Sequence, residues 1–317
     1  MVRISFTLLI SLLSILSFSQ TKTNKENLAG SAPVIKVTLL GTGTPLPVME
    51  RFGPAILVEA GSETLLFDAG RGCLQRLRQV NVFYNQIDAL FLTHLHSDHI
   101  VGIPDLWLSG WLTSERKTPL QVFGPTGTNA MISNLQKAFA YDIKIRVKDD
   151  RASEEGSRLL PKEIKQGVVY KKNGVKVIAF LVDHYPVAPA YGYRVEYQNH
   201  SVVLSGDTRY SENLVSYAKG TDLLIHEVAI APDTLSKSDP RYHILAHHIT
   251  PELAGKVFSQ VKPKLAAYSH IVNIYGQKEE DILNRTKSTY QGALVLGKDL
   301  MSFSIADSIS VNTWQKK

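Results

Sequence analysis

At residues 89–99 the chain reads Ala-Leu-Phe-Leu-Thr-His-Leu-His-Ser-Asp-His, an apolar run that leads straight into a polar cluster. The apolar run is typical of a buried strand. The polar residues after it predict a loop at the end of that strand, where a rigid scaffold presents functional side chains. Imidazole and carboxylate are ligands for zinc and similar divalent metals. Four such side chains lie close together here: His94, His96, Asp98 and His99. This density favours a metal site over a solvated polar turn.

The composition is that of an ordinary globular protein. Of the 317 residues, 44% are hydrophobic and 20% are charged, which is enough chain for a large core in one domain or two. The formal net charge of +6 suits an anionic substrate. No block of Lys and Arg is dense enough to favour nucleic acid, so a mildly basic surface is the better explanation. The single cysteine, Cys73, excludes an intramolecular disulfide and a cysteine metal cluster.

The first nineteen residues have the pattern of a signal peptide. Arg3 precedes an apolar, serine-rich run from Ile4 to Phe18, and small residues follow at the positions that a signal peptidase recognises. The run is too short for a stable membrane span, although an uncleaved anchor is the alternative. We expect cleavage between Ser19 and Gln20, a flexible lead-in over residues 20–33 and one domain over residues 34–317. The mature protein should therefore be periplasmic or secreted, without a stable membrane anchor.

Apolar strands that end in histidine or a carboxylate recur along the chain. The sequence predicts four further strands with such ends: 175–181 before His184, 201–205 before Asp207, 223–225 before His226-Glu227, and 265–268 before Ser269-His270. The first of them should form a hairpin, because Asn173-Gly174 is a strong turn signal. A layered α/β protein builds a site along one edge of its sheets in this way.

Helices are expected between these strands, at 73–80, 102–112, 128–141, 211–219 and 251–261. Thr250 before Pro251-Glu252 is a strong helix start. Trp107 and Trp111 share a helix face, and core packing explains them better than a substrate pocket. Asp68, at a strand end, is well placed to accept a hydrogen bond from a ligand histidine. A helix-start role for Asp68 is almost as good an explanation.

Together these motifs resemble the metallo-β-lactamase superfamily, in the branch that contains tRNase Z, the metallo-type arylsulfatases and the class II cyclic-nucleotide phosphodiesterases. The resemblance spans nearly all of residues 34–305. It rests on His94-x-His96-x-Asp98-His99 together with Gly41-Thr42-Gly43, Phe67-Asp68-Ala69-Gly70, Gly206-Asp207-Thr208 and His248-Ile249-Thr250. The fold that it implies is an αββα sandwich, with two mixed β-sheets face to face and helices on the outer faces.

The resemblance also implies two divalent metal ions, with zinc as the default and manganese or iron as alternatives. The first ion would be bound by His94, His96 and His184, and the second by Asp98, His99 and His270. Asp207 would bridge the two ions together with a hydroxide. Such a pair of cations can clamp both the attacking and the leaving oxygen of a displacement.

His248 and Glu227 resemble the pair that the tRNase Z branch uses beside its metals. The histidine could protonate the leaving oxygen, and a carboxylate behind it would fix its tautomer and raise its pKa. The competing explanation is that His248 merely begins a helix. With Asp98, these two residues are the catalytic candidates. The remaining histidines are expected to be structural or at the surface: His200, His226, His243 and His247.

The function that the resemblance implies is an exported metal-dependent hydrolase of a small anionic ester, either an aryl sulfate or a phosphodiester. The alternative is a tRNA 3′-end processing endonuclease. The predicted signal peptide and the lack of a long Gly-Pro-rich insertion between Ala140 and His184 count against that alternative. Asp207, where a β-lactamase usually has cysteine, argues against that activity, and the full ligand set argues against a non-catalytic module. Dimers are common in this branch, so the resemblance allows a homodimer.

Overall fold

The computed structural model describes residues 34–315, which form fifteen strands, nine α-helices and two short 3₁₀ helices. The strands are β1 (Ile35–Gly41), β2 (Ala55–Ala60), β3 (Glu63–Phe67), β4 (Ala89–Phe91), β5 (Leu120–Gly124), β6 (Leu159–Glu163), β7 (Gly167–Lys172), β8 (Val175–His184), β9 (Val187–Tyr197), β10 (His200–Leu204), β11 (Leu223–Ile230), β12 (Leu265–Asn273), β13 (Leu294–Leu296), β14 (Ser302–Ile305) and β15 (Ile309–Asn312). The helices are α1 (Cys73–Gln79), α2 (Ser97–Ile100), α3 (Ile103–Ser114), α4 (Thr128–Ala138), α5 (Ala140–Lys148), α6 (Glu212–Ala218), α7 (Tyr242–Ala246), α8 (Pro251–Val261) and α9 (Glu279–Lys287).

The predicted signal peptide over residues 1–19 and the lead-in over residues 20–33 lie outside the described residues. Within residues 34–315, none of the helices is long and apolar enough to cross a lipid bilayer.

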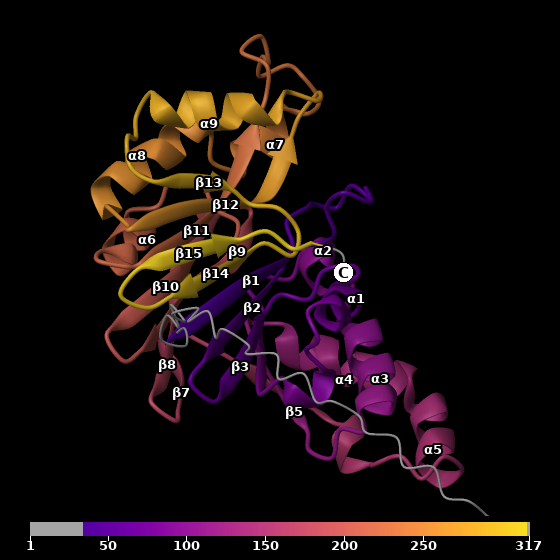
Figure 1. Cartoon of the computed structure of the whole chain (residues 1–317). Helices are drawn as coiled ribbons and strands as arrows, with labels where there is room; N and C mark the ends of the chain where they lie inside the picture. Colours follow the sequence, from indigo (N-terminus) through magenta and orange to yellow (C-terminus); the bar gives the residue numbers. More distant parts are fainter. Residues whose placement is uncertain (1–33, 316–317) are drawn as a thin grey trace, which may run out of the picture. The chain divides into compact units, whose positions relative to one another are not determined.

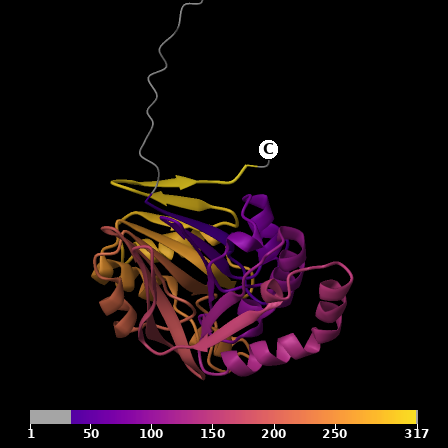
Figure 2. The same ribbon diagram turned by 90° about the horizontal axis from the view of Figure 1, so that it is seen from below.

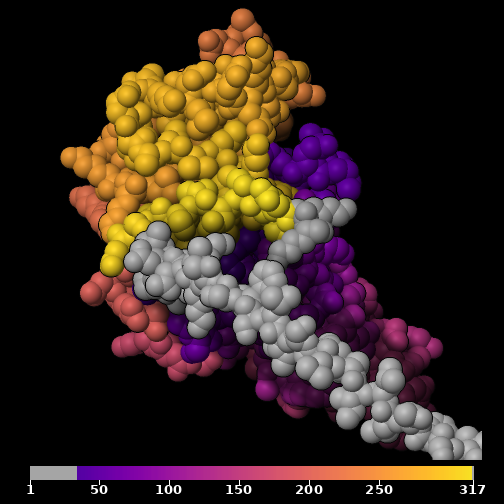
Figure 3. Space-filling model, viewed as in Figure 1, coloured from indigo at the N-terminus to yellow at the C-terminus, as the bar shows by residue number. Residues whose placement is uncertain are grey.

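Two mixed β-sheets form the centre of the described domain. The first has eight strands in the order β15-β14-β1-β2-β3-β4-β5-β6, and the second has seven in the order β13-β12-β11-β10-β9-β8-β7 (Figure 1). Figure 2 shows the C-terminal hairpin of β14 and β15, in yellow, at the edge of the first sheet beside β1. In the space-filling view of Figure 3, these yellow segments pack against indigo ones. Pairing between the two ends of the domain therefore completes the first sheet.

Alternating side chains explain how the two sheets pack. In β4, Ala89 and Phe91 point into the core between the sheets, whereas Leu90 packs against the outer helices. Phe91 stacks between Phe67 and Phe123, with ring centroids 5.0 and 4.9 Å away. A strand that is covered on both faces has no polar side, which is why the apolar run before the ligand motif is unbroken.

Helices cover both outer faces of the sandwich. Helices α1, α3 and α4 pack on the first sheet, and α6, α8 and α9 pack on the second (Figure 1). Trp107 and Trp111 are buried in α3, and the Trp107 indole N–H donates to the Ser157 carbonyl at 2.7 Å, so the prediction of core packing is confirmed. Cys73 is also buried. The architecture is the αββα sandwich that the resemblance implied.

One local prediction is wrong, and one strand was missed. The helix expected at 128–141 is two helices, because the chain leaves helical geometry at Phe139 between α4 and α5. The strand β6 was not predicted, because its pattern of burial is too irregular to show an alternation of apolar and polar residues. The hairpin at Asn173-Gly174 is confirmed, since β7 and β8 pair antiparallel across it.

Candidate metal centre

Side chains from four separate parts of the chain meet at one place. All seven predicted ligands, and His248 with them, are brought together in three overlapping groups, and within each group the candidate ligand atoms lie within 4.8 Å of one another. The groups are His94, His96, His184 and Asp207; Asp98, His99 and His270; and Asp207, His248 and His270. Because Asp207 and His270 each belong to two groups, the groups form one continuous centre.

The central motif supplies four of these side chains. Its first two histidines follow β4 in an extended segment, and His96 is the residue before α2. Asp98 and His99 lie on the first turn of α2, so the expected loop is partly helical. This short helix turns the second pair of ligands away from the first pair, which allows one stretch of chain to serve two ions.

Three ring nitrogens converge in the first group. His96 Nδ1 lies 3.0 Å from His94 Nε2 and 3.3 Å from His184 Nε2. Burial, together with the neighbouring histidines, lowers the pKa of His94 well below its usual value. The neutral imidazole is the form that binds metals. Three neutral rings that direct nitrogen lone pairs at one point repel each other unless a cation lies between them, so this donor set fits a divalent ion.

Asp207 lies between the two groups. Its Oδ2 atom is 3.3 Å from Nε2 of both His99 and His270, and 3.9 Å from His94 Nε2. Asp98 Oδ2 lies 3.3 Å from His270 Nε2 and 3.6 Å from His99 Nε2. Within residues 34–315, the buried His99 Nε2 makes no hydrogen bond of good geometry. An orphaned buried nitrogen facing two carboxylates also fits a cation, and the position of Asp207 suits a bridging ligand.

Buried polar groups fix the orientation of the ligand histidines. Asp68 Oδ2 accepts from His99 Nδ1 at 2.8 Å, and the same carboxylate accepts from the Thr93 amide and hydroxyl at 2.8 and 2.9 Å. The Thr93 hydroxyl, which donates to Asp68, can accept from His94 Nδ1 at 3.0 Å. The His184 Nδ1 atom lies 3.1 Å from the His247 carbonyl. Each of these three rings can thereby donate through Nδ1 and direct Nε2 at the centre.

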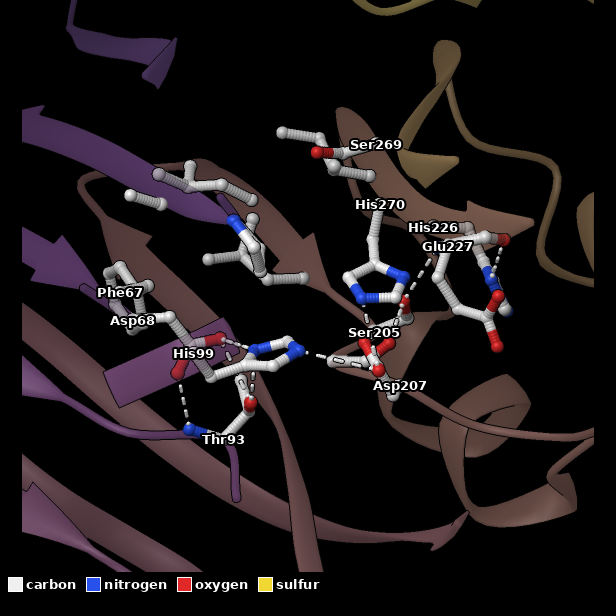
Figure 4. A pocket seen from close by; sticks show the side chains of 16 residues that line it. Phe67, Asp68, Thr93, His99, Ser205, Asp207, His226, Glu227, Ser269 and His270 are labelled. Atoms are coloured by element: carbon white, nitrogen blue, oxygen red, sulfur yellow. Dashed lines mark hydrogen bonds and ion pairs between the residues drawn. The ribbon is translucent and has the colours of Figure 1, made fainter. Parts of the chain in front are cut away.

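Figure 4 shows the inner part of this centre, around a cavity of about 40 Å³. The rings of His99 and His270 both point at Asp207, and Asp68 and Thr93 lie behind His99. Asp68 is therefore placed where the sequence predicted. Thr93 and the His247 carbonyl were not predicted. Thr93 could have been suggested by its position directly before His94, but a backbone carbonyl carries no sequence signal.

Two predicted strand ends are wrong, and the reason is a β-bulge. Strands β11 and β12 continue past the polar residues to Ile230 and Asn273. Their register passes from His226↔Tyr268 to Val228↔Ile271, so that Ser269 and His270 together lie opposite Glu227. His270 has a φ of 44°, in the left-handed region. A bulge of this kind re-aims a side chain, and here it places His270 in the centre from within a strand.

His248 and Glu227 form a pair at the rim of the centre. Glu227 is 2% exposed, and its Oε1 atom accepts from the amides of Thr208 and Ile249 at 3.1 and 3.2 Å. The same oxygen lies 3.2 Å from His248 Nδ1. Burial alone would lower the pKa of His248, but the Glu227 carboxylate raises it to about 9. The helix-start role belongs to Thr250, whose hydroxyl accepts from the Leu253 amide, so His248 is free to act on a substrate.

The other histidines lie in surroundings of a different kind. His226 is buried against Phe258, His243 is exposed, and His200 lies 3.4 Å from Asp222. His247 is half-buried and acts through its carbonyl, as described above.

Comparison with known proteins was consistent with this geometry. A family model described as "Anti-Pycsar protein Apyc1" matches residues 35–238. A curated relative named ribonuclease Z, from Mycolicibacterium gilvum, is 36% identical over 272 residues, covering 84% of this chain and 95% of the relative.

The similar solved structures include two that cover most of this chain. YhfI from Bacillus subtilis, a metallo-β-lactamase fold protein, has a TM-score of 0.67 at 19% identity, over 84% of this chain and 98% of its own. The short form of human tRNase Z has a TM-score of 0.66 at 22% identity, over 86% of this chain and 99% of its own.

Proposed function

Because this chain belongs to the ribonuclease Z branch of the metallo-β-lactamase superfamily, we propose that it hydrolyses phosphodiester bonds in RNA. That it is a metal-dependent hydrolase follows from its family and its fold. The finer proposal depends on one observation, the position of the His248–Glu227 pair at the rim of the centre.

The identity of the leaving group explains why this pair matters. An aryl sulfate releases a phenolate, whose conjugate acid has a pKa of about 10 as in tyrosine, and such a group leaves with little help. A ribose oxygen is a far more basic leaving group, so its departure benefits from a positioned acid. A buried acid kept protonated by its own carboxylate therefore supports a nucleotide ester over an aryl sulfate.

The roles of the side chains follow from their positions. The seven ligands would hold two divalent ions, and zinc suits this mixture of imidazole and carboxylate. When bound, such ions lower the pKa of a water molecule and draw charge from the phosphate oxygens. Asp68 and Thr93 keep the rings of His99 and His94 in place.

His248 supplies the proton for the leaving oxygen. Its Nδ1 atom faces Glu227, so Nε2–H is the group available to a substrate. As the bond from phosphorus to the leaving oxygen breaks, this proton passes to that oxygen and leaves a neutral imidazole. Glu227 stabilises the protonated form of His248 beforehand.

The names of the relatives support RNA as the substrate better than an exported sulfatase. The lack of a long insertion between Ala140 and His184 does not count against a ribonuclease, because the match covers 95% of the length of a relative that carries the ribonuclease Z name. Export remains a prediction.

A phosphodiesterase of small nucleotides is a second candidate. One observation favours it: the family model that matches residues 35–238 is described as anti-Pycsar protein Apyc1 and not as a ribonuclease.

A direct test is hydrolysis by the full chain loaded with zinc. The substrates are a 3′-extended precursor tRNA, a single-stranded RNA, a cyclic mononucleotide and an aryl sulfate. We expect RNA cleavage, and we expect His248→Ala to lower it by about 10²–10⁴-fold, the usual contribution of a general acid. The matched control is His243→Ala, an exposed histidine of the same segment. Turnover of the cyclic nucleotide alone would support the second candidate, and turnover of the sulfate alone would refute both.

A further inference from the structure

An open groove of about 420 Å³ begins beside His248. Besides His248, Asp183 and Arg209 line it, and its apolar wall includes Tyr242, Leu245 and Leu253. Asp183 directly precedes the ligand His184, and Arg209 follows the ligand Asp207 by two residues. The groove therefore adjoins the metal centre on the side where the proposed acid lies.

The backbone holds Arg209 in place at this groove. Its amide donates to the Asp183 carbonyl at 2.8 Å, and the Asp183 amide donates to the Thr208 hydroxyl at 3.1 Å. These bonds tie together the segments that carry two of the ligands. The backbone of Arg209 is thus fixed relative to the segments that carry His184 and Asp207.

The guanidinium of Arg209 has donors to spare. Its Nη2 atom donates to Asp183 Oδ1 at 2.6 Å, whereas its Nη1 atom makes no hydrogen bond within residues 34–315. The side chains of Arg209 and Asp183 are 39% and 51% exposed, so water screens this ion pair and it contributes little to stability. A guanidinium with unused N–H donors, held only in a weak surface ion pair, can bind a phosphate through bidentate hydrogen bonds.

We propose that this groove binds the leaving strand of single-stranded RNA, with Arg209 on the phosphate next to the scissile one. The inference rests on the proposed RNA hydrolysis and specifies its substrate. His248 protonates the leaving oxygen, so the strand released from it must run along the groove that begins at His248. Tyr242 and Leu245 offer an aromatic and an aliphatic surface on which a base can stack. A mononucleotide has no second phosphate and cannot use Arg209.

The test compares two substrates that differ in the number of phosphates. One is an RNA tetranucleotide, and the other is a dinucleoside monophosphate, whose only phosphate is the scissile one. Three variants of the zinc-loaded full chain are measured: Arg209→Ala, Asp183→Asn and Arg146→Ala. Arg146 is the matched control, because it is a half-exposed arginine of α5 that pairs with Asp142 and with Asp150, just beyond the end of the helix.

We expect Arg209→Ala to lower kcat/KM for both substrates unequally. The factor of loss should be about ten times or more larger for the tetranucleotide than for the dinucleoside monophosphate, mainly through a higher KM. Asp183→Asn should have the opposite effect and lower KM for the tetranucleotide, because it releases Arg209 from a competing carboxylate. In a His248→Ala background, binding of the tetranucleotide is followed by fluorescence anisotropy. There, Arg209→Ala should reduce the slope of log K against log salt by about 0.7, the loss of one phosphate contact on a single strand.

If Arg209 only braces Asp183, the two groove variants should impair both substrates equally and leave the salt slope unchanged, which would overturn this inference alone. If the wild-type protein cleaves neither diester, the proposed function is overturned and this inference with it. Because Asn has the same shape as Asp, Asp183→Asn is the milder change, and its effect on KM decides the question even if Arg209→Ala fails to fold.

Discussion

Replacing Glu227 by glutamine separates the charge of this residue from its hydrogen bonds. Glutamine has the same shape and retains an oxygen for the amides of Thr208 and Ile249, at 3.1 and 3.2 Å. The variant loses only the negative charge 3.2 Å from His248 Nδ1. Without that charge, the remaining burial would bring the pKa of His248 from about 9 to its ordinary 6.5 or below.

The size of the effect follows from the fraction of His248 that is protonated. At pH 8, a group with a pKa of about 9 is about 90% protonated, and a group with a pKa of about 6.5 is about 3% protonated. If the protonated form is the acid, Glu227→Gln should therefore lose about 30-fold in kcat at pH 8. Near pH 6 most of this loss should disappear, because the protonated form is again populated in the variant.

The assay is single-turnover cleavage of a single-stranded RNA by the zinc-loaded protein, from pH 5.5 to 9.5. The Glu227 carboxylate raises the pKa of His248, so the activity that depends on the protonated ring should persist up to about pH 9 in the wild type and fall above about pH 6.5 in the variant. Bound cations lower the pKa of His248 in the wild type and in the variant alike. The difference in pKa between the two proteins is therefore the quantity to compare. An equal loss at pH 6 and pH 8, or an unshifted alkaline limb, would refute the role of the pair.

Four further expectations concern metal binding, stability and processing. Asp68→Asn should weaken zinc binding about 10- to 100-fold, because it removes the charge that orients His99, and competition with a chromophoric chelator measures this. Removal of metal should abolish hydrolysis and lower the melting temperature, and added zinc should restore both. The loss of stability should be about 4 kcal/mol relative to protein with zinc at ~1,000 times its Kd, and an unchanged melting temperature would count against the site. Trp107→Ala should cost about 3–5 kcal/mol in urea unfolding, whereas Tyr141→Ala, at a side chain 80% exposed, should cost almost nothing. Intact mass of the secreted protein should show Gln20 as the first residue, and retention of residues 1–19 would contradict export.

Local sequence determined those features that depend on near neighbours in the chain. The ligand-dense motif that follows an apolar run predicted the metal centre, because ligand types were concentrated within six residues. The helix from Pro251 to Val261 was predicted with its bounds, because a hydroxyl cap, a proline and an acid define a helix start within one turn. The resemblance to a family extended this to the αββα fold and to all seven ligands.

Tertiary structure alone decided how the distant ligands meet. His184 is 88 residues from His96, and His270 is 172 residues from Asp98, yet their ligand atoms lie 3.3 Å apart in each pair. Such distances depend on strand order and register, and a one-residue change of register redirects every side chain of a strand. The bulge that turns His270 into the centre, the Thr93 hydroxyl behind His94 and the groove at Arg209 arise from contacts of this long-range kind. The sequence could therefore identify the chemical groups of this protein, whereas only the pairing of its two sheets determined which of them come within bonding distance.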